Sequence, residues 1–262
     1  MVKTPLSGLR ILITNDDSIN SCGIKALERI ANSITPDVWV IAPEVGQSGK
    51  GFSITFDSIL RINELSPRRF SVSGTPADSV FTALGQILSD KKPDLVLSGI
   101  NNGSNLADFV GVSGTVGAAF AAASQNIKAI AVSQHFTRDC PLKFPLAEHF
   151  LPIIIKKLMS FTWPENVCMN VNLPEVPIGE VKGIRVAKQG KIDVSWHVHK
   201  RNDPVESPYY WLHATYKRRD NEEDTDVVLV EKENYITVTP LQSRHEFPDC
   251  IGKLEELFSS NG

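Results

Sequence analysis

The sequence predicts an α/β protein built on a doubly wound, mostly parallel sheet. Three observations support this fold class. Over the first 135 residues, β-branched runs alternate with Ala- and Leu-rich runs, the β-branched runs are nearly all apolar, and polar segments follow three of them. Nearly continuous apolar runs are typical of strands buried on both faces of a parallel sheet, and their alternation with helical runs is typical of βα units.

Local patterns justify the first elements in order. The run LRILIT at residues 9–14 predicts a strand, and apolar residues spaced three to four apart predict a helix over 23–34. The run VWVIA at 38–42 predicts a second strand, and residues 69–73 predict a third.

The next elements continue this alternation. Thr-Pro at the start of 75–88 predicts a helix there, because Thr caps helices and Pro fits the first helical position. The Ala-rich run at 114–124 predicts another helix, between strands expected at 94–98 and 127–133. Right-handed crossovers then give a Rossmann-like sheet with the carboxyl ends of its strands at one edge.

The texture of the sequence changes in its C-terminal part. A helix is expected over 146–161 and a strand over 167–172, and the later stretch 227–240 alternates like an arm of a β-hairpin. We therefore expect one domain over 1–262, with an α/β core over about 1–175 and a β-rich elaboration, serving as an arm, over about 176–262.

Composition narrows the class of protein. The chain has 262 residues, of which 42% are hydrophobic and 22% charged, and this balance excludes a largely disordered protein. A net charge of −3 without a long basic block argues against binding to a nucleic acid duplex. No apolar run approaches the roughly 20 residues of a membrane span, and no secretory signal is recognisable. The four cysteines form neither a CxxC pair nor a disulfide framework, which favours a reducing cytoplasm.

The polar segment after the first expected strand contains two adjacent carboxylates, Asp16 and Asp17. Like charges repel strongly in a partly dry site, and a bound divalent cation is the usual remedy. Ligation by oxygen atoms alone favours Mg²⁺, Mn²⁺ or Ca²⁺. The alternative interpretation is that Asp16 caps a turn while Asp17 is solvated.

Two further polar segments follow expected strands, at 43–51 and 98–105, and reach the same edge of the sheet. The first offers the Ser48 hydroxyl between small residues. The second offers neutral oxygen atoms and amide donors from Asn101, Asn102 and Asn105. Gly, Ser and Asn also dominate ordinary turns, so the three loops are evidence for a binding site only when they are taken together.

The residues Ser113, Gly114 and Thr115 open the Ala-rich helix directly after these loops. The free N–H groups and the positive end of the helix dipole could hold an anion there. The alternative is an ordinary Ser N-cap.

Five segments, ILITNDDS, APEVGQSGKGFSIT, VSGTPADSV, PDLVLSGINNGSN and SGTVGAA, occur in this order and resemble the survival protein SurE family of metal-dependent nucleotidases. The later segments NVNLP and ITVTPL resemble the C-terminal part of that family. One departure is Ser18, where the family usually has glycine.

The resemblance implies one divalent metal cation per subunit, Mg²⁺ or Mn²⁺, and removal of phosphate from nucleoside 5′-monophosphates. It also implies activity on 3′-monophosphates and short polyphosphate. The implied metal ligands are Asp16, Asp17, Ser48 and Asn101. The cation would activate a water molecule for in-line attack. Asp16 and Asp17 are the expected catalytic residues, and Asp16 is expected to orient or deprotonate that water. The alternative is attack on phosphorus by an aspartate, through a phospho-aspartyl intermediate. The expected phosphate contacts are Asn102, Asn105, Ser113, Gly114 and Thr115.

The resemblance also implies a homodimer or homotetramer whose C-terminal arms cross between subunits. The aromatic cluster Tyr209, Tyr210 and Trp211 fits a core, a subunit interface or a wall for a base. We expect residues within about 205–245 to cross to the partner.

Other classes of protein fit less well. A phosphate-binding or phosphoacceptor signalling module without hydrolase activity remains the alternative, although the segments after the later strands lack its Asp and Lys. A dinucleotide-dependent oxidoreductase would need a GxGxxG turn after the first strand, which is absent. All six histidines lie at or beyond His135, which argues against a His-rich dinuclear phosphatase. The alternating pair His197 and His199 is more typical of a surface or interface than of a zinc site.

Overall fold

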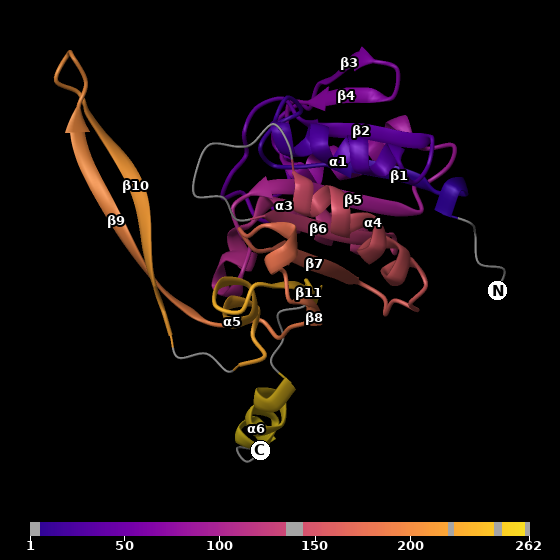
Figure 1. Cartoon of the computed structure of the whole chain (residues 1–262). Coiled ribbons are helices and arrows are strands. Elements are labelled where there is room, and N and C mark those ends of the chain that lie inside the picture. The colour runs from indigo at the N-terminus through magenta and orange to yellow at the C-terminus, as the bar shows by residue number, and fades with distance from the viewer. Residues whose placement is uncertain (1–5, 135–143, 220–222, 244–247, 260–262) are drawn as a thin grey trace.

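A nine-stranded sheet with the order β3-β4-β2-β1-β5-β6-β7-β11-β8 forms the centre of the computed structural model, which describes residues 6–134, 144–219, 223–243 and 248–259 (Figure 1). The strands of this sheet are β1 (Arg10–Thr14), β2 (Asp37–Pro43), β3 (Ile62–Ser66), β4 (Arg69–Val72), β5 (Leu95–Asn102), β6 (Lys128–Gln134), β7 (Val167–Leu173), β8 (Gly183–Val186) and β11 (Tyr235–Gln242). A separate antiparallel hairpin consists of β9 (Ile192–Asn202) and β10 (Pro208–Arg218) and projects away from the sheet (Figure 1).

The helices connect the strands. They are α1 (Cys22–Asn32), α2 (Pro76–Thr82), α3 (Gly114–Ala123), α4 (Pro145–Met159), α5 (Asp226–Glu231) and α6 (Pro248–Ser259). Short turns of other helix types are η1 (Leu6–Gly8), η2 (Ala83–Ile87), η3 (Ala107–Val112) and η4 (Ile178–Glu180).

The six central strands, β4-β2-β1-β5-β6-β7, are parallel, and the direction of winding changes between β1 and β5. Chain segments that leave the carboxyl ends of β1 and β5 therefore run to opposite faces, the arrangement that in doubly wound sheets opens a crevice for a ligand. This topological switch point is the usual place for a ligand in a doubly wound sheet, and it lies where the sequence places its acidic pair.

Two hydrophobic clusters cover the two faces of the sheet. Side chains of β1 alternate between them: Ile11 and Ile13 pack with α1 and α4, whereas Leu12 packs with α2 and α3. Because each of these β1 side chains is fully buried, the strand is apolar along its length, as the run at 9–14 predicted.

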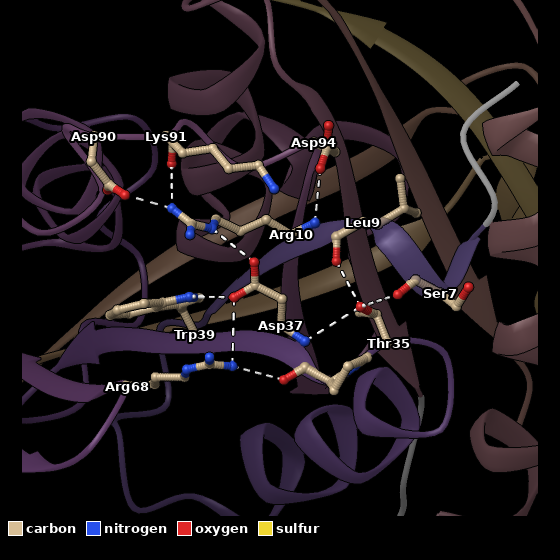
Figure 2. Close-up of polar contacts among 11 residues, drawn as sticks. Ser7, Leu9, Arg10, Thr35, Asp37, Trp39, Arg68, Asp90, Lys91 and Asp94 are labelled. Atoms are coloured by element: carbon tan, nitrogen blue, oxygen red, sulfur yellow. Dashed lines mark hydrogen bonds and ion pairs between the residues drawn. The ribbon is translucent and has the colours of Figure 1, made fainter. Parts of the chain in front are cut away.

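The opposite, amino-terminal edge of the strands is closed by a polar cluster around Asp37 (Figure 2). The Arg10 guanidinium donates to Asp37 Oδ2 at 3.0 Å, and the Trp39 indole donates to Asp37 Oδ1 at 2.9 Å. Partial burial raises the pKa of Asp37, but these hydrogen bonds and the charges of Arg10 and Arg68 hold the pKa below its usual range. The cluster joins the starts of β1 and β2 and lies at the edge opposite the carboxyl ends of the strands.

The structure confirms the predicted fold class and the elements expected within residues 9–133, 146–161 and 167–172, with shifts of a few residues at their ends. The edge strand β3 was not foreseen. Its side chains are mostly exposed, so it lacks the apolar pattern that marks the central strands.

The expected hairpin arm at 227–240 is wrong. Residues 226–231 form helix α5, and residues 235–242 form β11, which pairs antiparallel with β7 inside the main sheet. The run Val227–Val230 resembles a strand because it is β-branched, but burial of every side chain in it stabilises a helix against this propensity. The projecting arm is the earlier pair β9 and β10.

The cysteines also differ from expectation. Cys22, the first residue of α1, is disulfide-bonded, whereas Cys168 and Cys250 are free thiols. Among the described residues, no helix is both long enough and apolar enough to cross a membrane.

One close backbone approach near the carboxyl edge depends on Gly117 of α3. A Cβ atom at this position would lie 2.0 Å from the carbonyl oxygen of Gly51, in the loop after β2. We predict that Gly117→Ala lowers the free energy of unfolding by about 1–3 kcal/mol, measured by urea denaturation, because neither backbone can yield without moving that loop. Gly85→Ala is the matched control, since its Cβ would meet nothing within 4 Å. Equal stability of Gly117→Ala and the unchanged protein would contradict the packing.

Candidate active site

The turn after β1 is fixed by Asn15. Its amide Nδ2 donates to the Ser18 carbonyl at 2.9 Å and to the Ser21 hydroxyl at 2.8 Å. Ser21 is in turn the N-cap of α1. The turn places the adjacent side chains of Asp16, which is 5% exposed, and Asp17, which is half-buried, at the switch point. Sequence reasoning missed Asn15, although Asn often bonds nearby backbone in turns.

Asp16 contacts the start of helix α3. The Thr115 hydroxyl donates to Asp16 Oδ1 at 2.6 Å. A Cβ atom on Gly114 would lie 2.7 Å from Asp16 Cβ and 3.0 Å from Oδ2, so only glycine lets the helix approach this closely. The negative carboxylate is therefore held at the positive end of the α3 dipole.

The other two loops are bound to the acidic pair through their backbones. The Gln47 amide donates to the Asp16 carbonyl at 2.7 Å, and the Asn102 amide lies 3.4 Å from Asp17 Oδ2. The three polar segments predicted to share one edge do meet there. Gln47 was not singled out from the sequence, because its contribution comes from a backbone group that any residue supplies.

Ser48 and Asn101 lie next to these contacts. Ser48 follows Gln47 directly and is exposed. Asn101 is half-buried and donates from Nδ2 to the Gly103 carbonyl at 2.8 Å. The neutral oxygen atoms of Ser48 and Asn101 thus belong to loops that are bonded to Asp16 and Asp17, the first to the Asp16 backbone and the second to the Asp17 carboxylate.

The electrostatics of the pair follow from its burial. Burial raises the pKa of Asp16 to about 6; hydrogen bonding from Thr115 opposes the rise, and the charge of Asp17 adds to it. Burial likewise raises the pKa of Asp17, against the hydrogen bond from the Asn102 amide. The two carboxylates are costly to ionise together, which is the condition that a cation would relieve.

The candidate phosphate contacts divide into two groups. Asn102 is exposed beside Asp17, and Gly114 forms the first turn of α3 next to Asp16. Ser113 instead caps α3, with its Oγ accepting from the Val116 amide at 3.1 Å, as the alternative interpretation held. The Thr115 hydroxyl donates its hydrogen bond to Asp16 and not to a phosphate group.

Asn105 requires a correction. It is 7% exposed, and its Nδ2 donates into the core to the Ser133 hydroxyl at 2.7 Å, so this side chain is not placed to bind a phosphate group. The sequence pattern suggested otherwise because Asn105 belongs to the same Asn-rich segment as Asn101 and Asn102.

Other groups were considered as sites. Among the residues that the structure describes, no three His, Cys, Asp or Glu side chains gather to hold a metal ion. His197, His199 and His213 are exposed on one face of the β9–β10 hairpin, with ring centroids 6.3 and 6.4 Å apart. A metal at the acidic pair would therefore depend on two carboxylates and neutral oxygen atoms.

A cavity of about 870 Å³ lies at the amino-terminal edge of the strands and is lined by residues such as Asn126, Lys128 and Lys156. It is far along the strands from the acidic pair. We place the candidate site at Asp16 and Asp17 because burial raises the pKa values of these two adjacent carboxylates. The large volume of the cavity does not by itself indicate a functional site.

Fold and site together define a class: doubly wound α/β proteins with an acidic, oxygen-rich binding site at the topological switch point. The comparison with known proteins is more specific. A family profile described as Survival protein SurE matches residues 11–196. The chain belongs to the SurE family.

Relatives of this chain are similar over nearly their whole length. A protein of Paramagnetospirillum magneticum named 5′-nucleotidase SurE is 45% identical over 252 residues, covering 96% of each chain. A 5′-nucleotidase SurE of Parvibaculum lavamentivorans is 45% identical, covering 92% of this chain and 88% of the relative. The crystal structure of the SurE protein of Aquifex aeolicus superposes with a TM-score of 0.80 at 36% identity, covering 94% of this chain and 98% of that one.

The turn that carries the acidic pair contains one strained residue. Ser18 has φ +97°, in the region that favours glycine. We predict that Ser18→Gly raises the free energy of unfolding by about 1 kcal/mol in chemical denaturation, because the strain of a side chain at this angle is removed. Asn20→Gly, an exposed neighbour whose φ is not positive, should give no such gain. A Ser18→Gly protein less stable than the original would contradict the strain.

Proposed function

We propose that this protein is a metal-dependent phosphatase that hydrolyses nucleoside 5′-monophosphates to nucleoside and phosphate. The observation that carries the proposal is the buried Asp16 carboxylate held against the first turn of α3, with Asp17 beside it. The relatives named 5′-nucleotidase SurE, similar over nearly the whole chain, support the same activity.

We propose one Mg²⁺ or Mn²⁺ ion per subunit, held by Asp16, Asp17, Ser48 and Asn101. The donor set fits such an ion, because it consists only of oxygen atoms and includes two carboxylates whose pKa values are raised by burial. When bound, the cation would offset the charge of the phosphoryl group and lower the pKa of water.

Individual residues of this chain then have separate roles in the proposed reaction. Thr115 fixes Oδ1 of Asp16, which leaves Oδ2 to accept the proton of the attacking water. The water oxygen bonds to phosphorus as the ester bond to the nucleoside breaks, and the leaving oxygen takes up the proton that Asp16 accepted from the water, which returns Asp16 to its carboxylate form. We propose that the Gly114 amide and the Asn102 side chain bind phosphate oxygens, whose negative charge the α3 dipole favours.

The substrate range is a second part of the proposal. We expect activity on nucleoside 3′-monophosphates and short polyphosphate in addition to 5′-monophosphates. Phosphate release from a panel of these compounds, with and without Mg²⁺ or Mn²⁺, tests this directly. Tight nucleotide binding without release would instead favour a phosphate-binding module.

The first functional prediction concerns Asp16. Asp16→Asn should lower kcat by several orders of magnitude while the protein stays folded, because the change removes a charge and the proton acceptor from the site. Phosphate release at saturating Mn²⁺ measures the effect. Asp57→Asn makes the same change of charge at an exposed position and should leave kcat unaltered. Near-normal turnover of Asp16→Asn would exclude the assigned role.

We also propose a homodimer, or a dimer of dimers, in which the hairpin arm crosses to the partner. One face of the arm carries Trp196, Val198, Tyr210 and Leu212, which are 56%, 66%, 62% and 61% exposed. An isolated two-stranded arm is at best marginally stable in water, so a second copy that covers this face would stabilise it. Residues 226–242 lie in the body of the protein, so the proposed crossing segment is the hairpin at 192–218, which begins and ends earlier than the 205–245 expected from the sequence.

Light scattering tests this assembly. The variant Trp196→Ser/Leu212→Ser should shift the protein to monomer at micromolar concentration, because it removes two large apolar side chains from that face. Phe56→Ser/Ile59→Ser removes two side chains of similar exposure outside the arm and should keep the dimer. A monomeric unchanged protein, or a double arm variant that dimerises as tightly, would refute the arm exchange. A cytoplasmic location stays a prediction.

A further inference from the structure

The segment 105–107 joins the two halves of the candidate site. It follows Asn101 and Asn102 at the end of β5 and leads through η3 to the start of α3 at Gly114. Ala107 in this segment has φ +48°, so the chain turns sharply there. A segment of this kind needs strong anchoring, because its backbone can neither continue a strand nor begin a regular helix.

Side chains of β7 hold Asn105. The Asn105 amide donates to Asn172 Oδ1 at 2.8 Å, and the Asn105 carbonyl accepts from Nδ2 of Asn170 at 2.8 Å and of Asn172 at 3.1 Å. Asn170 and Asn172 are two residues apart in one strand, so they lie on the same face, and both are fully buried.

Two residues from the C-terminal third hold Ala107 in the same way. The Ala107 amide donates to Asp226 Oδ2 at 3.1 Å, and its carbonyl accepts from Gln189 Nε2 at 2.7 Å. Asp226 is fully buried, and its Oδ1 accepts from the Gly190 and Val227 amides at 2.8 Å each. Both polar backbone groups at Asn105 and at Ala107 are thus bonded to side chains distant in sequence.

We propose that Asn170, Asn172, Asp226 and Gln189 are positioning residues for the active site. By fixing the backbone at 105–107, they set where Asn101 and Asn102 lie relative to Asp16, Asp17 and the start of α3. This inference rests on the proposed function for the site that it positions. The inference goes beyond the proposed function by assigning a role in metal and phosphate affinity to four residues that touch neither ligand.

The chemistry of these bonds indicates how to break them singly. An amide offers one acceptor oxygen where a carboxylate offers two. In Asp226→Asn that oxygen would keep the bonds to Gly190 and Val227, and the amide nitrogen would face the Ala107 N–H without accepting from it. Asn172→Leu removes both bonds to Asn105 at similar volume, and Asn172→Asp keeps only the acceptor.

A matched control lies beside Asn172. Thr237 of β11 is its register partner and is equally buried, and its Oγ1 has no hydrogen-bond partner within the part of the chain that the structure describes. Thr237→Val therefore alters the same buried layer without loosening segment 105–107.

The experiment measures the dissociation constants for Mn²⁺ and for inorganic phosphate, with kcat and KM for the nucleotide and amide hydrogen exchange over 101–115. We expect Asn172→Leu and Asp226→Asn to weaken Mn²⁺ or phosphate binding by about 10-fold or more and to speed exchange at Asn105 and Ala107. Asn172→Asp should fall between these and the control, and Thr237→Val should stay within about twofold of the unchanged protein. Gln189→Ala changes an exposed residue and gives a folded test if Asn172→Leu does not fold.

Two results would overturn the proposal, and they are distinguishable. If exchange speeds up while Mn²⁺ and phosphate binding and kcat/KM stay at the level of Thr237→Val, the four residues serve stability alone. If the unchanged protein neither binds Mn²⁺ nor releases phosphate, the proposed function fails, and the positioning role fails with it.

Discussion

The repulsion between two adjacent carboxylates, held largely out of water, is the constraint on which the rest of the site depends. Burial raises the pKa values of Asp16 and Asp17, so the fold must supply positive potential and hydrogen bonds nearby. It does so with the amino end of α3, the Thr115 hydroxyl and the Asn102 amide. Gly114 is needed for the same reason, because a larger residue would push the helix away from Asp16.

The topology of the sheet allows these polar groups to gather at one edge of an otherwise apolar core. The switch point between β1 and β5 lies at the carboxyl ends of the strands, between segments that run to opposite faces of the sheet, each covered by its own hydrophobic cluster. The Asp37 cluster closes the opposite edge with ion pairs, of which the Arg10–Asp37 pair is partly buried (Figure 2). The polar groups at the two edges thus have different tasks: one joins strands, and the other leaves carboxylates available.

Much of the fold could be predicted because buried parallel strands have an apolar pattern that a short sequence reveals, as in β1 and β5. The three loops could be predicted to meet because parallel strands share an edge. Other features could not be predicted. The Val-rich run of α5 has strand propensity and becomes helical only through burial. Gln47 acts through its backbone. The Asn105 side chain turns inward to the Ser133 hydroxyl, while Asn170 and Asn172 bind the Asn105 backbone. Each of these depends on contacts that only the folded chain makes.

The anchoring of segment 105–107 has a consequence for how the protein is made. Its partners lie 67 residues further along the chain at Asn172 and 119 residues further at Asp226. During synthesis, which proceeds from the N-terminus, every candidate metal ligand therefore leaves the ribosome well before the residues that fix segment 105–107. The half-finished chain carries the acidic pair without its mature surroundings, and the site is completed only when the last third of the chain has folded onto the sheet.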